Sequence, residues 1–360
     1  MNKRYNFMNV LRVLSMLFIV FYHMLITLYI DGIRQLESIS FLFENANMHI
    51  AKIGVGLFFM LSGAGLMLSS HGDDFSALKF YKKRFFKILI PFYIVYFFYF
   101  VFLVTIGEMN LSNPFGDKEL KPYSFIFTIF GMDAYLENFG VPTCSLGIGE
   151  WFLGCLILIY LLFPVLRLSM LTSRKIAMIT STIYFAFICI FYFYVPAFVF
   201  VNPYMNMALK IYDFILGMNL VLTIKKRRKI TPFICAAILL FFILYPTKMA
   251  GTEDFQIPIQ CLCIYIIFEA LEKIFEKVPK VMNIIVILAA YSYEYFLVHH
   301  VVIIHMTKLG MNKAFGNLQI VLLFLGEIVL TTVLAILLKK FTGIIYEVIP
   351  HKKSDNPQVG

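Results

Sequence analysis

Long apolar segments alternate with short polar or charged stretches along the whole chain. Ten of these segments are bounded by charge clusters or by loops rich in proline and glycine. A helix that crosses a bilayer needs about 20 apolar residues, because each residue adds about 1.5 Å to its length. The pattern therefore predicts about ten transmembrane helices, over residues 7–30, 50–69, 86–107, 148–170, 176–195, 205–223, 230–247, 256–271, 282–307 and 318–341.

One segment, 124–139, departs from this pattern. Its sequence is SFIFTIFGMDAYLENF, which is apolar at the start but carries Asp133 and Glu137. A charged side chain at the centre of a spanning helix costs about 2.5 to 3.5 kcal/mol on insertion scales. We therefore expect an interfacial or re-entrant element here, within the longest loop, 108–147.

The composition supports a membrane protein and limits the number of domains. The chain of 360 residues is 61% hydrophobic and 14% charged, whereas an ordinary soluble domain is about 25% charged. Ten helices leave no room for a large soluble domain. We predict an all-α fold, a polytopic integral-membrane bundle forming one domain over 1–345, followed by a short cytoplasmic tail over 346–360. The first helix is expected to be retained, because its apolar run continues to Ile30 without a small-residue cleavage site.

The lysines and arginines of the loops predict the orientation. With the amino terminus inside, 22 of the 31 lysines and arginines fall on the cytoplasmic side, as the positive-inside rule requires. Both termini are then cytoplasmic, which is consistent with an even number of helices. The net charge of +10 is explained by this topology, and no nucleic-acid partner is expected.

The first helix carries two ionisable side chains, Arg12 and His23, within the run RVLSMLFIVFYHMLITLYI. If the helix starts at the cytoplasmic surface near Phe7, Arg12 lies about 8 Å into the membrane and His23 about 24 Å. Ionisable side chains are costly in hydrocarbon and usually face the interior of the bundle. The alternative for His23 is a simple hydrogen bond to a neighbouring helix.

Two further residues are expected at the depth of His23. His299 lies about 26 Å along a predicted helix that runs in the same direction, and Glu150 begins the fourth helix at the outer side. We therefore predict that the imidazoles of His23 and His299 border one cavity and lie within about 10 Å of each other. His300 points about 100° away from His299, and His305 lies nearer the helix end, so both are interpreted as structural or interfacial.

A second group of candidate residues lies at the cytoplasmic edge. The segment FYKKRFFKILIPFY places Arg84 and Lys87 three residues apart on one helical face, and Arg12 lies at a similar depth. These cations are candidates for binding the phosphates of an anionic cytoplasmic cofactor. The alternative is that they mark the topology or contact lipid headgroups. No metal site is predicted, because the cysteines lack spacing of the CxxC kind.

Four blocks of the sequence form a distinctive series. The first, MNVLRVLSMLFIVFYH, has Arg12 followed eleven residues later by His23. The others are GVGLFFMLSGAGL, then KRFFKILIP, which ends in Pro91, and SYEYFLVHH, which contains His299. Together, in order and spacing, they resemble the acyltransferase-3 family of integral-membrane acyltransferases. Lys87 is a departure, because an RxxR pattern would have a second arginine there, and a lysine does not bind phosphate in a bidentate manner.

The resemblance implies transfer of an acyl group, most often acetyl, to a sugar hydroxyl at or beyond the outer face. An imidazole can remove the hydroxyl proton as the oxygen attacks a thioester, and an acyl-histidine intermediate is an alternative. His23 is the expected base, with His299 or Glu150 orienting it or the acceptor. The acceptor is expected to be a surface glycan or a lipid-linked saccharide.

The resemblance also implies the donor and the location. The donor is expected to be acetyl-coenzyme A or another short acyl-coenzyme A such as succinyl, held by Arg12, Arg84 and Lys87. The expected location is the bacterial plasma membrane, where the protein contacts membrane lipids. A glycan-synthesis complex and a homo-oligomer are both left open as assemblies.

Two other classes of protein fit the composition. A transporter or flippase for a lipid-linked glycan would also be basic and polytopic, but it would be expected to show related halves or interrupted helices in corresponding positions. We see neither in the sequence. A catalytically inert relative that scaffolds a glycan-synthesis complex is the other alternative.

Overall fold

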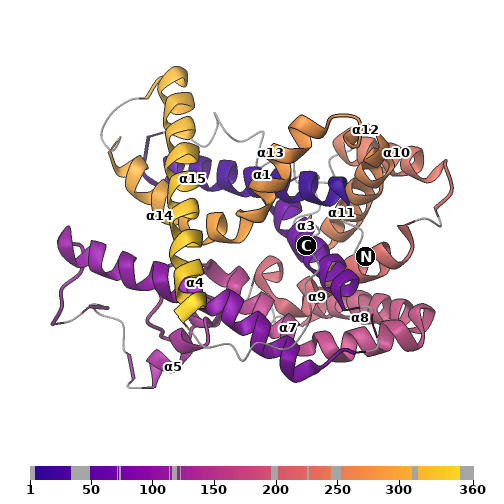
Figure 1. Ribbon diagram of the computed structural model, residues 1–360, viewed down its shortest axis with the longest axis horizontal. Coiled ribbons are helices and arrows are strands. Elements are labelled where there is room, and N and C mark those ends of the chain that lie inside the picture. The colour runs from indigo at the N-terminus through magenta and orange to yellow at the C-terminus, as the bar shows by residue number, and fades with distance from the viewer. Residues whose placement is uncertain are drawn as a thin grey trace.

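The computed structural model describes most of the chain, and in that part all regular structure is helical (Figure 1). The described residues are 5–33, 49–70, 72, 74–112, 114–115, 120–121, 123–195, 202–224, 227–244, 253–309 and 315–348. The first three residues of the expected tail, 346–348, continue the last helix, and the rest of the tail lies outside the described residues.

Each of the ten predicted segments contains helix. The long helices are α1 (Asn6–Ile30), α3 (Ile50–Ser69), α4 (Ala77–Thr105), α7 (Glu150–Thr172), α8 (Arg174–Tyr194), α9 (Met207–Leu222), α10 (Thr231–Leu244), α11 (Glu253–Ala270), α13 (Pro279–Ala290), α14 (Ser292–Lys308) and α15 (Asn317–Val348). The short ones are α5 (Ser124–Ile129), α6 (Asp133–Glu137), η4 (Pro203–Met205) and α12 (Glu272–Phe275). The all-α fold class is therefore confirmed.

Six of the described helices, α1, α3, α4, α7, α8 and α15, are long and apolar enough to cross a membrane. The pair α13 and α14 passes the same test together and would make a seventh span. Helix α10 and the part Phe255–Ala270 of α11 are apolar but shorter, with 10 to 17 residues each. The chain thus has the helices of a multi-pass membrane protein, whereas the count of ten spans and the cytoplasmic location of the termini stay predictions.

The prediction of one continuous helix over 282–307 is wrong. The helix is interrupted at Tyr291, and α13 and α14 are bent by 66° relative to each other there. A break leaves backbone carbonyls without helical donors, and Lys339 of α15 donates from Nζ to one of them, that of Ala290. The same Nζ lies 4.4 Å from the ring centroid of Tyr291 and 3.7 Å from Oε1 of Glu294. Lys339 thus ties the last helix to the break.

Segment 124–139 forms two short helices, α5 and α6, and no spanning helix, as its charged residues predicted. The hydroxyl of Tyr93 on α4 donates to the carbonyl of Ile129 at the end of α5. Helix α6 packs closely on α7, because a Cβ added at Gly154 would lie 2.4 Å from the Cβ of Tyr135. The segment therefore contacts both α4 and α7 and links them.

Helices α3 and α9 form the tightest contact of the bundle's core. A Cβ at Gly63 of α3 would lie 2.1 Å from the carbonyl oxygen of Phe214, and one at Gly217 of α9 would lie 1.8 Å from that of Met60. Small residues at such a crossing let two helix backbones touch. Helix α3 is also the most enclosed of the six candidate spans, with 72% of its apolar window buried, against 17% for α15.

We predict that Gly63→Ala destabilises the protein while Gly65→Ala does not. The added methyl at position 63 collides with a backbone carbonyl that cannot turn away, and overpacking of this kind costs about 1 to 3 kcal/mol of unfolding free energy. At Gly65, two residues further along and on the other side of the same helix, nothing lies within 4 Å of an added Cβ. Thermal unfolding of both variants in detergent measures the difference, and equal melting temperatures would contradict the backbone contact.

Candidate active site

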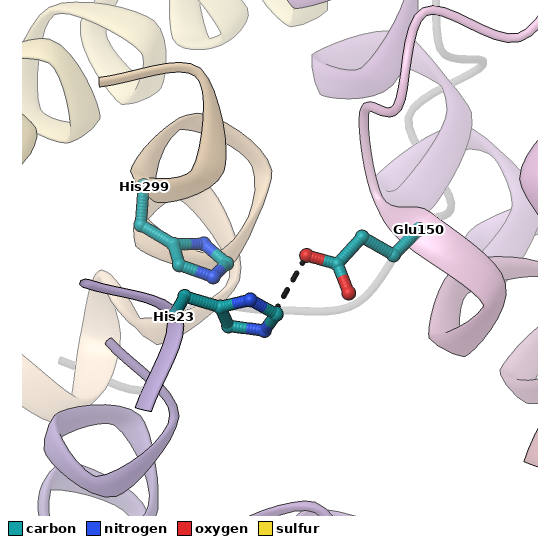
Figure 2. Close-up of side chains that lie close together, drawn as sticks. All are labelled: His23, Glu150 and His299. Carbon is teal, nitrogen blue, oxygen red and sulfur yellow. Dashed lines mark ion pairs between the residues drawn. The ribbon is translucent and has the colours of Figure 1, made fainter. Parts of the chain in front are cut away.

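Three ionisable side chains from three helices converge in the bundle: His23 of α1, Glu150 of α7 and His299 of α14 (Figure 2). The ring centroids of His23 and His299 are 5.3 Å apart. Nε2 of His23 lies 3.5 Å from Oε1 of Glu150. The predicted proximity of the two imidazoles is confirmed, whereas the catalytic roles of all three residues stay predictions.

His299 is held in one orientation by its own helix. Its Nδ1 lies 2.7 Å from the carbonyl oxygen of Phe296, and a carbonyl only accepts, so Nδ1 carries the proton. Nε2 is then left with its lone pair. This nitrogen is buried and has no hydrogen-bond partner among the described residues, and the whole residue is 1% exposed.

Glu150 stands at a strained position of the backbone. It is the first residue of α7 and has a φ of 41°, directly after Gly149 with a φ of 71°. Among the described residues it is the one non-glycine residue with a positive φ. Such strain is costly and concentrates at functional sites, where it aims a side chain. Here it directs the carboxylate towards the two histidine-bearing helices, as Figure 2 shows.

His300 belongs to the same cluster, although the sequence predicted a structural or interfacial role for it. Its Nδ1 lies 3.7 Å from Oε1 of Glu150, and its ring centroid lies 5.0 Å from that of His23. The two adjacent histidines of α14 straddle the line of contact with α1, so both reach His23. The side chains of His299 and His300 leave α14 about 100° apart. Both nevertheless contact the ring of His23, because His23 faces the gap between them.

A single cavity of about 1130 Å³ joins this cluster to the predicted phosphate-binding residues. Its lining includes His23 and Glu150 as well as Arg12, Arg84 and Lys87. His299 is not among the lining residues, so the prediction that both imidazoles border one cavity is correct for His23 and wrong for His299. Arg12 and His23 are eleven residues apart on α1, which is about 16 Å along a helix. The cavity therefore runs beside α1 from a basic region to the histidines.

The basic region contains two arginines that form no ion pair with a carboxylate in the described part of the chain. Arg12 is partly buried, and its side chain contacts Oδ1 of Asn9 at 3.5 Å without a carboxylate within 4 Å in the described part of the chain. The guanidinium of Arg84 lies 6.0 Å from the ring centroid of Tyr160. A partly buried cation is stabilised by an anionic partner, so this region is suited to a phosphate-bearing ligand.

Lys339 also lines the basic region, and the sequence did not identify it. Its position near the end of the last helix is typical of a topology-marking cation. Only the fold of α13 and α14 brings it to the cavity, where it pairs with Glu294.

Between the two ends, the wall of the cavity is mostly apolar and aromatic. Phe58, Phe152 and Phe296 line it together with Ser62. The hydroxyl of Ser62 is 2.6 Å from that of Tyr160, so these two polar groups satisfy each other. A long, flexible chain with few charges fits such a passage.

Comparison with known proteins identifies the family of the chain. The acyltransferase-3 family, described as an acyltransferase domain, matches residues 5–340. The chain therefore belongs to that family, which confirms the resemblance carried by the four sequence blocks and supports a membrane acyltransferase over a transporter. No curated protein and no solved structure matches the chain.

Proposed function

We propose that this protein transfers a short acyl group, in the first place acetyl, from cytoplasmic acyl-coenzyme A to a hydroxyl of a cell-surface or exported polysaccharide. Its location in this proposal is the bacterial plasma membrane, with Arg12 towards the cytoplasm and His23 towards the outer face. The observation that carries the proposal is the single cavity that runs from the basic region to a histidine and glutamate cluster. Membership of the acyltransferase family supports it.

The basic region would bind the donor. Arg12 and Arg84 line the cavity from α1 and α4, and charge-assisted contacts between guanidinium groups and phosphate are strong and directional. Lys87 and Lys339 add charge without the planar fork of an arginine. With the phosphates held there, the pantetheine arm extends along the apolar passage and carries the thioester towards His23.

The chemistry needs one proton transfer in each direction. Oε1 of Glu150, which lies 3.5 Å from Nε2 of His23, would accept a hydrogen bond from that nitrogen once the substrates are bound, and this would orient the ring and leave its second nitrogen to take the proton of the acceptor hydroxyl. The hydroxyl oxygen forms a bond to the thioester carbonyl carbon, and the bond from carbon to sulfur breaks. The imidazolium then returns the proton to the coenzyme thiolate, so His23 ends the cycle unchanged.

The histidine end of the cavity has side chains that suit a sugar. Tyr22, Trp151 and Tyr204 line it together with Asn202, and the rings of Trp151 and Tyr204 are 5.0 Å apart in an edge arrangement. Aromatic walls with a few polar groups are typical of sites that orient a small organic ligand. The acceptor would enter from this side, opposite the donor.

The experiment that tests the function uses isotope-labelled acetyl-coenzyme A and inside-out membrane vesicles that carry the protein. Label on the glycan supports the proposal, and labelled succinyl-coenzyme A in a parallel assay decides the acyl group. Movement of glycan across the membrane without incorporation of label would favour a transporter instead.

We predict that His23→Ala abolishes acyl transfer while the protein still folds and inserts. Removing a general base typically lowers the rate by about 100- to 10,000-fold. The matched control is His305→Ala, because His305 lies on α14 beyond the cluster and bonds to Tyr99 at 3.2 Å. Near-normal turnover of a well-expressed His23→Ala protein in the vesicle assay would remove His23 from the mechanism.

We predict that Arg12→Gln and Arg84→Gln each weaken binding of acetyl-coenzyme A by about tenfold or more, since each removes a charge-assisted contact worth about 1.5 to 3 kcal/mol. Equilibrium binding to the detergent-solubilised protein measures the effect. Arg174→Gln serves as control, because Arg174 begins α8 away from the cavity. If both cavity variants bind as tightly as this control, the two arginines act only in topology.

A further inference from the structure

The cluster of His23, Glu150 and His299 has the donor set of a transition-metal site. Each residue offers one ligand atom, and these three atoms all lie within 4.8 Å of one another. Two imidazoles and one carboxylate are a common ligand set for zinc in proteins. Figure 2 shows the three side chains reaching towards one another from separate helices. The sequence predicted no metal here, because cysteine spacing gave no such pattern and the residues are far apart in the chain.

The bond that holds His299 is the second observation. In most metal-binding histidines the nitrogen that does not bind the metal donates its proton to a backbone carbonyl or carboxylate, which fixes the tautomer. Nδ1 of His299 does this with the carbonyl of Phe296 at 2.7 Å. The other nitrogen, Nε2, is buried and has no partner in the described ranges. A buried lone pair without a donor is costly, and a bound cation would satisfy it.

In the described part of the chain, the carboxylate of Glu150 also lacks a hydrogen-bond partner for one of its oxygens. Its Oε1 is buried and accepts no hydrogen bond among the described residues, although Nε2 of His23 lies 3.5 Å away and Nδ1 of His300 lies 3.7 Å away. His300 is not one of the three residues whose ligand atoms all lie within 4.8 Å of one another. The site therefore has three protein ligands and an open fourth position, as catalytic zinc sites have.

The distances allow zinc after a small adjustment. Zinc binds nitrogen and oxygen at about 2.0 to 2.2 Å, so ligand atoms in a tetrahedral site lie about 3.3 to 3.6 Å apart. The separations here, up to 4.8 Å, require side-chain shifts of about 1 Å. Imidazole ligands favour zinc over magnesium and calcium, which take oxygen ligands in larger number.

We propose that this cluster binds one zinc ion, and that the bound ion blocks acyl transfer. The metal would occupy the space between His23 and Glu150, so it would replace the contact by which Glu150 holds the imidazole ready to take a proton. The inhibitory effect rests on the proposed function, whereas the binding of zinc does not. The site is thus open either to zinc or to the acceptor hydroxyl.

Binding is tested on the full-length protein in detergent, first stripped with a chelator and then titrated with zinc chloride in the absence of any coenzyme. We expect one zinc per chain, and an affinity at least about tenfold weaker in His299→Ala and in Glu150→Gln, since even outer-shell changes cost about 10- to 100-fold. The control is His305→Ala, which should bind as the unchanged protein does. Equal affinity in all four proteins would overturn the site.

A second measurement does not depend on variants that fold poorly. X-ray absorption at the zinc edge of the unchanged protein should show at least two imidazole ligands, and a spectrum with none or one would overturn the proposal. In the vesicle assay, saturating zinc should lower acyl transfer at least about 100-fold, as loss of the base does, with recovery after a chelator. Zinc bound at the cluster with unchanged transfer would overturn the inhibitory role alone. If the protein transfers no acyl group with or without zinc, the proposed function fails, and the zinc titration still tests the binding site.

Discussion

The contact between His23 and Glu150 is the interaction on which the candidate site depends. It joins α1 to α7 across the cavity, with Nε2 of His23 3.5 Å from Oε1 of Glu150. Among the described residues, few other polar groups in this part of the bundle could serve either side chain as a partner. Glu150 makes this contact from a helix start at which its backbone has a φ of 41°. The fold therefore accepts a locally unfavourable backbone to bring a carboxylate to two histidine-bearing helices.

Some other charges in the bundle are paired with an opposite charge on the same helix. Lys210 and Asp213 lie one turn apart on α9, 3.5 Å from each other, with side chains that are 2% and 1% exposed. They neutralise each other and do not line the cavity. Arg12 differs in both respects, because it lines the cavity and has no carboxylate within reach in the described part of the chain. The contrast separates a structural ion pair from a cation available to a ligand.

The sequence predicted the helices and the main partners of the site, because both follow from solvation. Apolar runs must span or be buried, and ionisable residues within them must turn inward, so His23, His299 and Glu150 could be placed together by depth. The bend at Tyr291 was not predictable in this way. No proline or glycine marks it, and it is held by Lys339, a residue 48 positions away in the chain.

The depth calculation predicted the proximity of His299 to His23 correctly, although it assumed a straight helix. It counted from the start of a straight helix, whereas His299 belongs to α14, which begins at Ser292. His300 was missed for a related reason, since helical geometry gives the direction of a side chain but not the width of the surface it faces. The bend at Tyr291 and the place of His300 in the cluster both depend on contacts between segments far apart in the chain. Such contacts cannot be predicted from the local pattern of a single sequence.

The contact between α3 and α9 has a mechanical consequence. With the carbonyls of Phe214 and Met60 seated against Gly63 and Gly217, these helices cannot slide or rotate past each other without a steric collision. One side of the cavity is therefore a stiff wall. Helices α4 and α15 also line the cavity and are far less enclosed. They lie against each other (Figure 1) without such backbone contacts at glycine, so they are less constrained than α3 and α9.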